Sequence, residues 1–559
     1  MPAAPASAPV DPNEPSAATA MRRLLGAIPT PLVAASASSV APSPDRVDPT
    51  AREPMQYVAD PLADASIAAI IGTWAASSEA ASAEALLALH ARHWRRIQIA
   101  NRMMTTWTDN AVLPDWKAPF ANETADADEA VVGEALEAYL RAAYTLPEWA
   151  DAAKIDRAET IFMEYGVLSC VLLFCASLPE CYVIPDLAAV LHVAGQLEQH
   201  TEYRIRSTAA MIFPVMMQGG LTTGQGAGIA QTLKVRMIHA TIRNLILRES
   251  PESAVTSLQS ALTHSQQTDS SMLGVVPPLA TLAGSHNMHQ ALFAHGWKLG
   301  EDGLPCNQEE LAYTLLTFGY IFLRGLRTLG LGLKREDEEA YLHAWNVMAH
   351  VLGIERGLMP QTMAEAEALF NLMQARGRAD TSMPDGRDAR PALGQALMQS
   401  MEDVIPLRLV KPFPTLLTRR LCGAAVAREI GLDGRVSWLS RALFYVVMGL
   451  IRGIDALVRL VFPEFSISRF ITRVVGYQFM SKFLMDQTRP LKLPTHLVNG
   501  VSEMMSAWSD DPKAPKWLNK LEDRLTTRGD WQVAATAANT ARAAKAAATA
   551  QSESTHAPR

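Results

Sequence analysis

The sequence predicts an all-α protein. Alternation of apolar and polar residues, which marks strands, is nearly absent along the chain. Apolar residues recur instead at three- and four-residue spacing, as one face of a helix requires. Helix starts are also recognisable, because Asn307 precedes QEEL and Asp337 opens EEAYLHAW. Both put acidic residues in the first turn, where the helix dipole favours negative charge.

Helices are expected along most of the chain from residue 61 onward. The run 159–178 is apolar nearly all round, which predicts a buried helix, and Pro179 is expected to end it. The other helical stretches expected, in order, are several helices in 61–121, then 126–144, 186–198, 202–217, 231–248, 308–329, 337–352, 362–375, 437–460 and 468–486.

The composition is that of a globular protein with large apolar cores. The chain has 559 residues, of which 49% are hydrophobic and 19% charged. Its formal net charge is −7, without a long block of one sign, so the concentrated basic face that binds nucleic acid is not expected. The five cysteines form no CxxC pair. This pattern indicates buried, reduced thiols rather than a zinc knuckle or a c-type heme attachment.

No segment is predicted to cross a membrane. The longest strongly apolar run, 165–178, is shorter than the roughly 20 residues that a helix needs to span a bilayer. The stretch 443–451 is also apolar. Arg452, Asp455 and Arg459 follow it at helical spacing, which indicates an amphipathic helix. We expect this helix to pack on the core, and peripheral contact of its arginine-lined edge with a membrane is the alternative.

Composition divides the chain into five stretches. Residues 1–55, rich in Ala, Pro and Ser, are predicted to be disordered because they bury too little apolar surface to offset ordering. Residues 56–139 are read as N-terminal helices, 140–430 as the domain that carries the motifs below, 431–525 as helices packed on the core, and 526–559 as a disordered Ala-rich tail. The compartment stays open. We favour the cytoplasm, but the sequence from Met21 has the basic start and apolar middle of an export signal.

A histidine and two arginines share one side of the predicted helix 231–248. Four aliphatic residues at helical spacing form its apolar stripe: Val235, Ile238, Ile242 and Ile246. His239 falls at the edge of this stripe, and Arg236 and Arg243 lie just beyond it. Such an imidazole suits an iron atom, and the guanidinium groups suit the carboxylates of an anionic macrocycle. A lone histidine on an apolar face is more often a satisfied core residue, so the residues alone leave both interpretations open.

The predicted helix 202–217 forms a natural opposing wall. Arg204, Thr208 and Met211 fall on one face of it. A distal heme pocket needs such donors to stabilise bound dioxygen. The alternative is an arginine paired with a nearby carboxylate and a threonine bonded to its own helix. The connection GGLTTGQGAG has no preceding strand and no following acid at ribose spacing, so we interpret it as a bend rather than a nucleotide loop.

Several motifs resemble, in family order, a known catalytic domain. They are FCASLPECY, YRIRSTAAMIFPVMMQGGL, KVRMIHATIR, NQEELAYTLLTFGYIFLRGL, EAYLHAWNVMAHVLGIERGLMP and LVKPFPTLLTRRLCG. Together they resemble the rubber oxygenases, or latex-clearing proteins, over about residues 140–430. A similar domain occurs in the fungal ER-bound oxygenase (MpaB) of mycophenolic acid synthesis.

The resemblance implies an all-α fold with a globin-like core around heme b. His239 stands where the family places its axial iron ligand, and Arg204 and Thr208 stand where it places its distal Arg and Thr. The implied reaction is that of a dioxygenase, in which O2 cleaves a carbon–carbon double bond of a hydrophobic, isoprenoid-type substrate and gives carbonyl products. Glu180 is a further candidate acid or base, since it directly follows the predicted buried helix.

The chain departs from this family at one position. Latex-clearing proteins can carry a distal lysine just before the threonine, whereas this chain has Ser207. A serine cannot cap iron as an amine can, so the sixth iron ligand and the substrate stay open. Two other functions also stay open: a non-catalytic helical protein that binds a lipid or isoprenoid, and a heme peroxidase-like oxidant.

Overall fold

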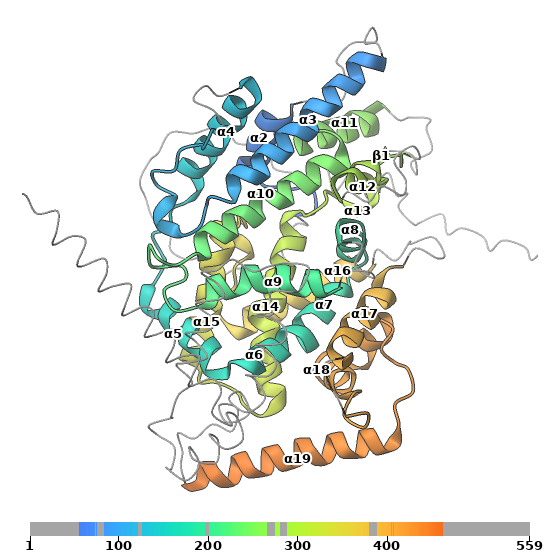
Figure 1. Cartoon of the computed structure of the whole chain (residues 1–559). Helices are drawn as coiled ribbons and strands as arrows, with labels where there is room; N and C mark the ends of the chain where they lie inside the picture. Colours follow the sequence, from blue (N-terminus) through green and yellow to red (C-terminus); the bar gives the residue numbers. More distant parts are fainter. Residues whose placement is uncertain are drawn as a thin grey trace, which may run out of the picture.

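The computed structural model describes residues 55–72, 74, 83–120, 126–195, 201–264, 274–279, 288–379, 388–403, 405 and 407–461. Across these residues the chain is mostly helical, and the strands among them form one antiparallel ribbon, β1 (Val275–Val276) with β2 (Trp297–Lys298). The prediction of an all-α fold is confirmed (Figure 1). The predicted disordered ends and the predicted helix 468–486 lie outside the described residues, apart from residue 55.

Helix α14 lies in the middle of the helical layers (Figure 1), and α7, α15 and α16 pack against it. The helices with their bounds are α2 (Pro61–Ile71), α3 (Ala83–Met104), α4 (Ala127–Ala143), α5 (Ala152–Tyr165), α6 (Val167–Leu172), α7 (Leu178–Tyr182), α8 (Pro185–Gly195), α9 (Thr201–Met216), α10 (Gly228–Leu247), α11 (Pro251–His264), α12 (Met288–Ala294), α13 (Leu299–Asp302), α14 (Gln308–Leu329), α15 (Arg335–Val351), α16 (Met363–Ala379), α17 (Arg390–Asp403), α18 (Phe413–Glu429) and α19 (Trp438–Val461). Short turns of other helix types occur at Asn110–Val112, Leu173–Ser177 and Arg356–Leu358.

Helix α14 is central because nearly every side of it is buried. Of its 22 residues, 17 are buried, including its N-terminal Gln308. The Asn307 side chain caps its start by accepting a hydrogen bond from the Glu310 N–H at 2.9 Å, as the sequence predicted. Aromatic rings join α14 to α15: Phe322 stacks on Tyr341 with centroids 4.7 Å apart. Burial of this much apolar surface stabilises the packing of the neighbouring helices on α14.

The predicted single buried helix 159–178 is wrong in its boundaries. The chain breaks at Gly166, whose φ of 45° is one that residues with a side chain rarely adopt. Helix α5 ends there, and a second helical run, 168–182, leaves at 90° to it. Of the helices that the structure describes, none is long and apolar enough to span a bilayer by itself, although these two pass that test as a bent pair.

Pro179 lies inside the second run instead of ending it. Proline has no N–H to donate to the carbonyl four residues earlier, and residues Leu173–Ser177 widen into a π-helical turn just before it. The thiol of Cys422 in α18 approaches the carbonyls of Cys175 and Ala176, at 3.6 Å to each oxygen. A weak sulfur donor from another helix therefore compensates for the hydrogen bond that the proline cannot make.

Candidate functional site

Helices α9 and α10 pack against each other, as the sequence predicted (Figure 1). The connection between them folds tightly on itself. The Gly228 N–H donates to the Gly220 carbonyl at 2.9 Å, and Gly219 has a φ of +72°. A Cβ placed on Gly226 would lie 2.2 Å from the Gly219 oxygen, which no side chain tolerates. The glycines are therefore needed for close backbone approach, in agreement with a bend rather than a nucleotide loop.

Asn110 fixes this bend and the start of α10. Its side-chain amide donates to the carbonyls of Gly220 and Thr223, each at 2.9 Å. Its side-chain oxygen accepts from the N–H groups of Ile229 at 3.1 Å and Ala230 at 3.3 Å. Residue Ala227, at the N-cap position of α10, has no side chain that could make these bonds. An asparagine more than a hundred positions away therefore acts as the cap.

Glu159 holds the other side of the bend. It comes from α5, its side chain is buried, and it accepts a hydrogen bond from the Gly219 N–H at 2.7 Å. Burial raises the pKa of this carboxyl from 4.5 to about 7, against the backbone N–H groups that lower it. The carboxyl therefore changes charge close to neutral pH.

The structure places His239 and Thr208 on the two packed helices. Both side chains are half-buried, as is Ser207, the residue that the resemblance predicts in place of a distal lysine. Helix α9 includes Arg204, but the side chain of Arg204 is outside the part that the structure describes. The roles of these residues as iron ligand and distal donors therefore stay predictions.

The two arginines of α10 bind carboxylates of α2 and its cap. Arg236 donates to Asp60 in a two-pronged pair, with one N–H···O distance of 2.7 Å, and to the Val351 carbonyl at 3.2 Å. Arg243 is fully buried; it pairs with Asp64 at 3.0 Å and donates to the Cys306 carbonyl at 2.6 Å. These bonds favour a role in fixing α10 onto α2. The predicted pairing of both arginines with carboxylates of a cofactor stays a prediction.

Glu180 lies in a buried network that joins α7 to α14 and α16. Its carboxylate pairs with Arg324 and accepts from Gln374 at 2.8 Å. Its backbone carbonyl accepts from the Tyr313 hydroxyl at 2.8 Å, and Gln374 donates to the same hydroxyl at 3.0 Å. Burial raises the pKa of Glu180, and Arg324 opposes this shift. These contacts tie Glu180 to the central helix rather than to α10, and its catalytic role stays a prediction.

Sequence reasoning missed Asn110 and Glu159. No local pattern marks either residue, because each acts on the bend between α9 and α10 from a distant part of the chain. The carboxylate partners of Arg236 and Arg243 were missed for the same reason, although Asp60 and Asp64 are four residues apart and share a helix face.

Comparison with known proteins identifies the family. Residues 279–453 match the family described as "ER-bound oxygenase mpaB/B'/Rubber oxygenase, catalytic domain". The chain thus carries a segment similar to the catalytic domain of this family. It is 25% identical over 329 residues to a rubber oxygenase of Streptomyces sp. (strain K30), an alignment that covers 58% of this chain and 65% of that protein. A solved structure of a latex clearing protein LCP in the closed state aligns with 82% of this chain and 92% of its own, at 18% identity and a TM-score of 0.45.

The matched segment contains only part of the candidate site. It includes α14 with Tyr313 and Arg324, and α16 with Gln374. The candidate residues on α7, α9 and α10 lie before it in the chain. The mpaB and rubber oxygenase family is therefore assigned from the second half of the protein, and the function of α9 and α10 must be argued from their own residues.

Proposed function

We propose that the protein is an oxygenase that uses heme b and O2 to cleave a carbon–carbon double bond in a hydrophobic, isoprenoid-type substrate. The observation that carries the proposal is the packing of α9, which contains Thr208, against α10, which contains His239. The resemblance to rubber oxygenases predicts this same pairing of helices. The relative's printed name, rubber oxygenase, supports a polymeric or oligomeric isoprenoid as the substrate class.

The residues of α9 and α10 fit a heme group in their chemistry. The imidazole of His239 is half-buried, so part of the ring can reach a ligand while its helix remains packed in the core. Small side chains occur on both helices: Ala240 follows His239 in α10, and α9 includes Ser207, Thr208 and Ala210. His239 would hold the iron through a ring nitrogen, and heme, when bound, supplies the activation of dioxygen.

Polar groups on α9 would supply the hydrogen-bond donors for the reaction. The Thr208 hydroxyl is a hydrogen-bond donor, and the spacing of four residues predicts that Arg204 adds a permanent positive charge on the same helix face. Fixed donors of this kind stabilise negative charge as it develops during the reaction. Ser207 is short and uncharged, so it cannot cap the iron as the family's lysine can.

The test of the cofactor is an absorption spectrum of the wild type beside His239→Ala. We expect the wild type to show a Soret band and the variant to lose native heme binding. The matched control is His90→Ala, which removes a half-buried imidazole on α3 that bonds the Trp74 carbonyl at 3.1 Å. Native heme binding with an unchanged iron environment in His239→Ala would refute the axial assignment.

The test of the reaction is product analysis. Incubation of the heme-loaded protein with oligoisoprenoids and O2 is expected to give aldehydes and ketones that mass spectrometry detects. Ser207 favours one rival function, a carrier that binds such chains without cleaving them. Binding without carbonyl products would support the carrier, and oxidation of simple dyes that needs hydrogen peroxide would support a peroxidase.

A further inference from the structure

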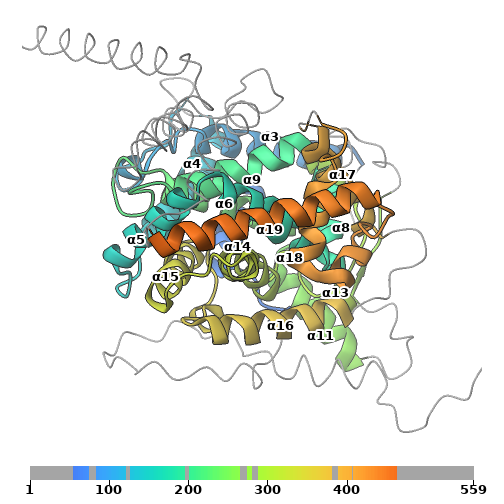
Figure 2. The same ribbon diagram turned by 90° about the horizontal axis from the view of Figure 1, so that it is seen from below.

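Helix α19 turns much of its apolar surface away from the protein. Trp438 is 68% exposed, Tyr445 59% and Leu450 58%. The side that faces the protein is narrow: Phe444 is buried and meets Phe413 of α18 edge-on, with ring centroids 5.3 Å apart. Figure 2 shows α19 as an outer helix that crosses one end of the molecule. The expected packing on the core therefore involves only one side of this helix.

The exposed positions form one continuous strip. Five of them recur at three- and four-residue spacing over the part of the helix whose side chains the structure describes: Trp438, Ala442, Tyr445, Gly449 and Gly453. Leu439, Val446 and Leu450 border them on one side and are exposed as well. A Cβ added to Gly449 or Gly453 would meet nothing within 4 Å. A helix that served only to cover the core would bury such a strip, since burying apolar surface is what stabilises it.

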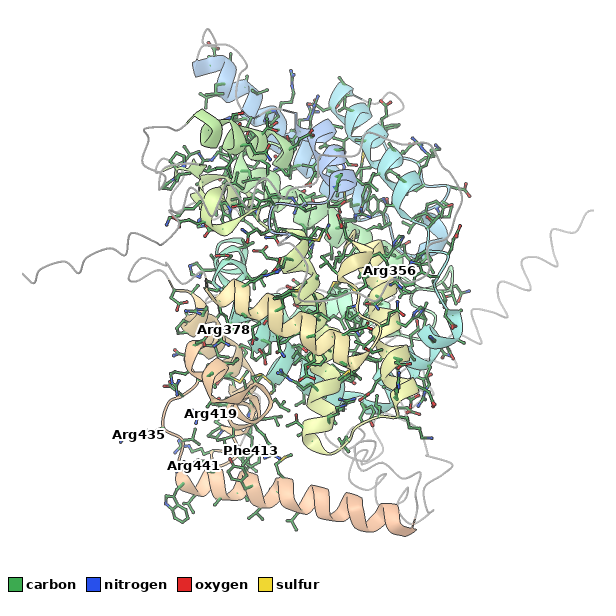
Figure 3. All side chains as sticks on the ribbon, turned by 180° about the vertical axis from the view of Figure 1, so that it is seen from behind. Arg356, Arg378, Phe413, Arg419, Arg435 and Arg441 are labelled. Atoms are coloured by element: carbon green, nitrogen blue, oxygen red, sulfur yellow. The ribbon has the colours of Figure 1, made fainter. Side chains whose placement is uncertain are left out.

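The surroundings of this strip are basic, although the whole chain is acidic. Residues 407–441 contain seven Lys and Arg but two Asp and Glu, in a chain whose net charge is −7. Arg435 and Arg441 are exposed, and Figure 3 shows them with Arg419 and Phe413 in the corner where α18 meets α19. The turn before α18 adds two exposed leucines, Leu407 at 66% and Leu409 at 51%.

We propose that α19 docks the protein on an anionic lipid bilayer. The strip combines aliphatic side chains with an exposed Trp and Tyr, the two residue types that concentrate at the membrane–water interface. Helices that lie in the bilayer surface have this apolar face and an edge of arginines that meets anionic headgroups. With Arg452 and Asp455 inside it, the helix is suited to lie on a membrane rather than to cross it. The inference stands apart from the proposed heme chemistry.

Vesicle co-sedimentation of the full chain tests the inference. The probes are vesicles of phosphatidylcholine alone and of equal parts phosphatidylcholine and phosphatidylserine. We expect binding to the second kind that weakens with salt. Val446→Asp with Leu450→Asp should reduce the partition coefficient by more than roughly tenfold, because two aliphatic side chains that the bilayer would bury are lost. The matched control is Leu87→Asp, a residue of α3 that is 70% exposed and should leave binding unchanged.

A second variant tests the charge and guards against misfolding. Arg435→Ser with Arg441→Ser leaves the apolar strip intact and should lower binding to the anionic vesicles by roughly 25-fold, at about fivefold for each arginine. Wild type that binds neither kind of vesicle would overturn the proposal, as would a strip variant that binds like the wild type. A wild-type dimer that becomes monomeric in the strip variant, without vesicle binding, would show that the strip joins two copies and would also overturn it.

Discussion

Replacement of Glu159 by glutamine should change how stability depends on pH. The folded protein binds the Glu159 proton more tightly than the unfolded chain, since burial raises the pKa from 4.5 to about 7. The free energy of unfolding is therefore unaffected by this group below about pH 4.5 and falls as the pH rises towards 7. At 1.36 kcal/mol for each pKa unit, the full cost is about 3 kcal/mol, an upper value because water reaches part of the site. Glutamine can still accept the Gly219 N–H but carries no charge.

The measurement is urea unfolding of the wild type and Glu159→Gln between pH 5 and 8. The variant should gain stability relative to the wild type by about 2–3 kcal/mol across this range, while other titrating groups cancel in the difference. Glu164→Gln is the control: Glu164 lies on the same helix, but its side chain is 34% exposed. A constant difference between wild type and Glu159→Gln at every pH would refute the assignment of a titrating anchor at the bend.

Three further substitutions test the site. Asn110→Ala should lower the free energy of unfolding by about 2–4 kcal/mol, because it removes the cap of α10 and leaves the buried N–H groups of Ile229 and Ala230 without their acceptor; thermal unfolding measures this. Arg243→Met should cost about 3–5 kcal/mol by leaving Asp64 buried without its cation, and adding Asp64→Asn should recover part of the loss in a double-mutant cycle. Thr208→Val should lower kcat roughly 100-fold with an unchanged heme spectrum, as loss of one aligned donor does; an unchanged kcat would remove Thr208 from the proposed site.

Periodicity predicted most helices, and local chemistry explains why. Asn307 capped α14 as expected because N-capping depends on residues only three apart. The run 159–178 was predicted as one helix because its hydrophobic pattern does not show where the helix axis changes direction. A glycine at 166 permits a left-handed backbone there, and only the packing of α5 on α15 shows that the chain turns. The effect of Pro179 was likewise hidden, since the Cys422 thiol comes from a helix far along the chain.

The helices of the candidate site could be predicted from the sequence, but the distant residues that hold these helices in place could not. The sequence placed Thr208 and His239 on two separate helices, and these helices pack against each other in the structure. The partners of Arg236 and Arg243 could not be predicted, because Asp60 and Asp64 lie more than 170 positions away. Charge alone made the arginines look available to a cofactor, whereas the fold engages both within the chain.

The opening residues of the described chain are seated on the first turn of α14. The Gln308 N–H donates to the Val58 carbonyl at 2.9 Å, the Leu304 N–H donates to the Gln56 carbonyl at 2.8 Å, and the Gln308 side chain bonds the Ala59 carbonyl at 3.0 Å. The segment recognised as the family's catalytic domain begins at residue 279, so these partners lie outside it. That segment expressed alone would lack residues 56–59, whose carbonyls accept hydrogen bonds from the start of α14. Chimeras that exchange this domain between relatives should therefore keep the chain from residue 55 onward together.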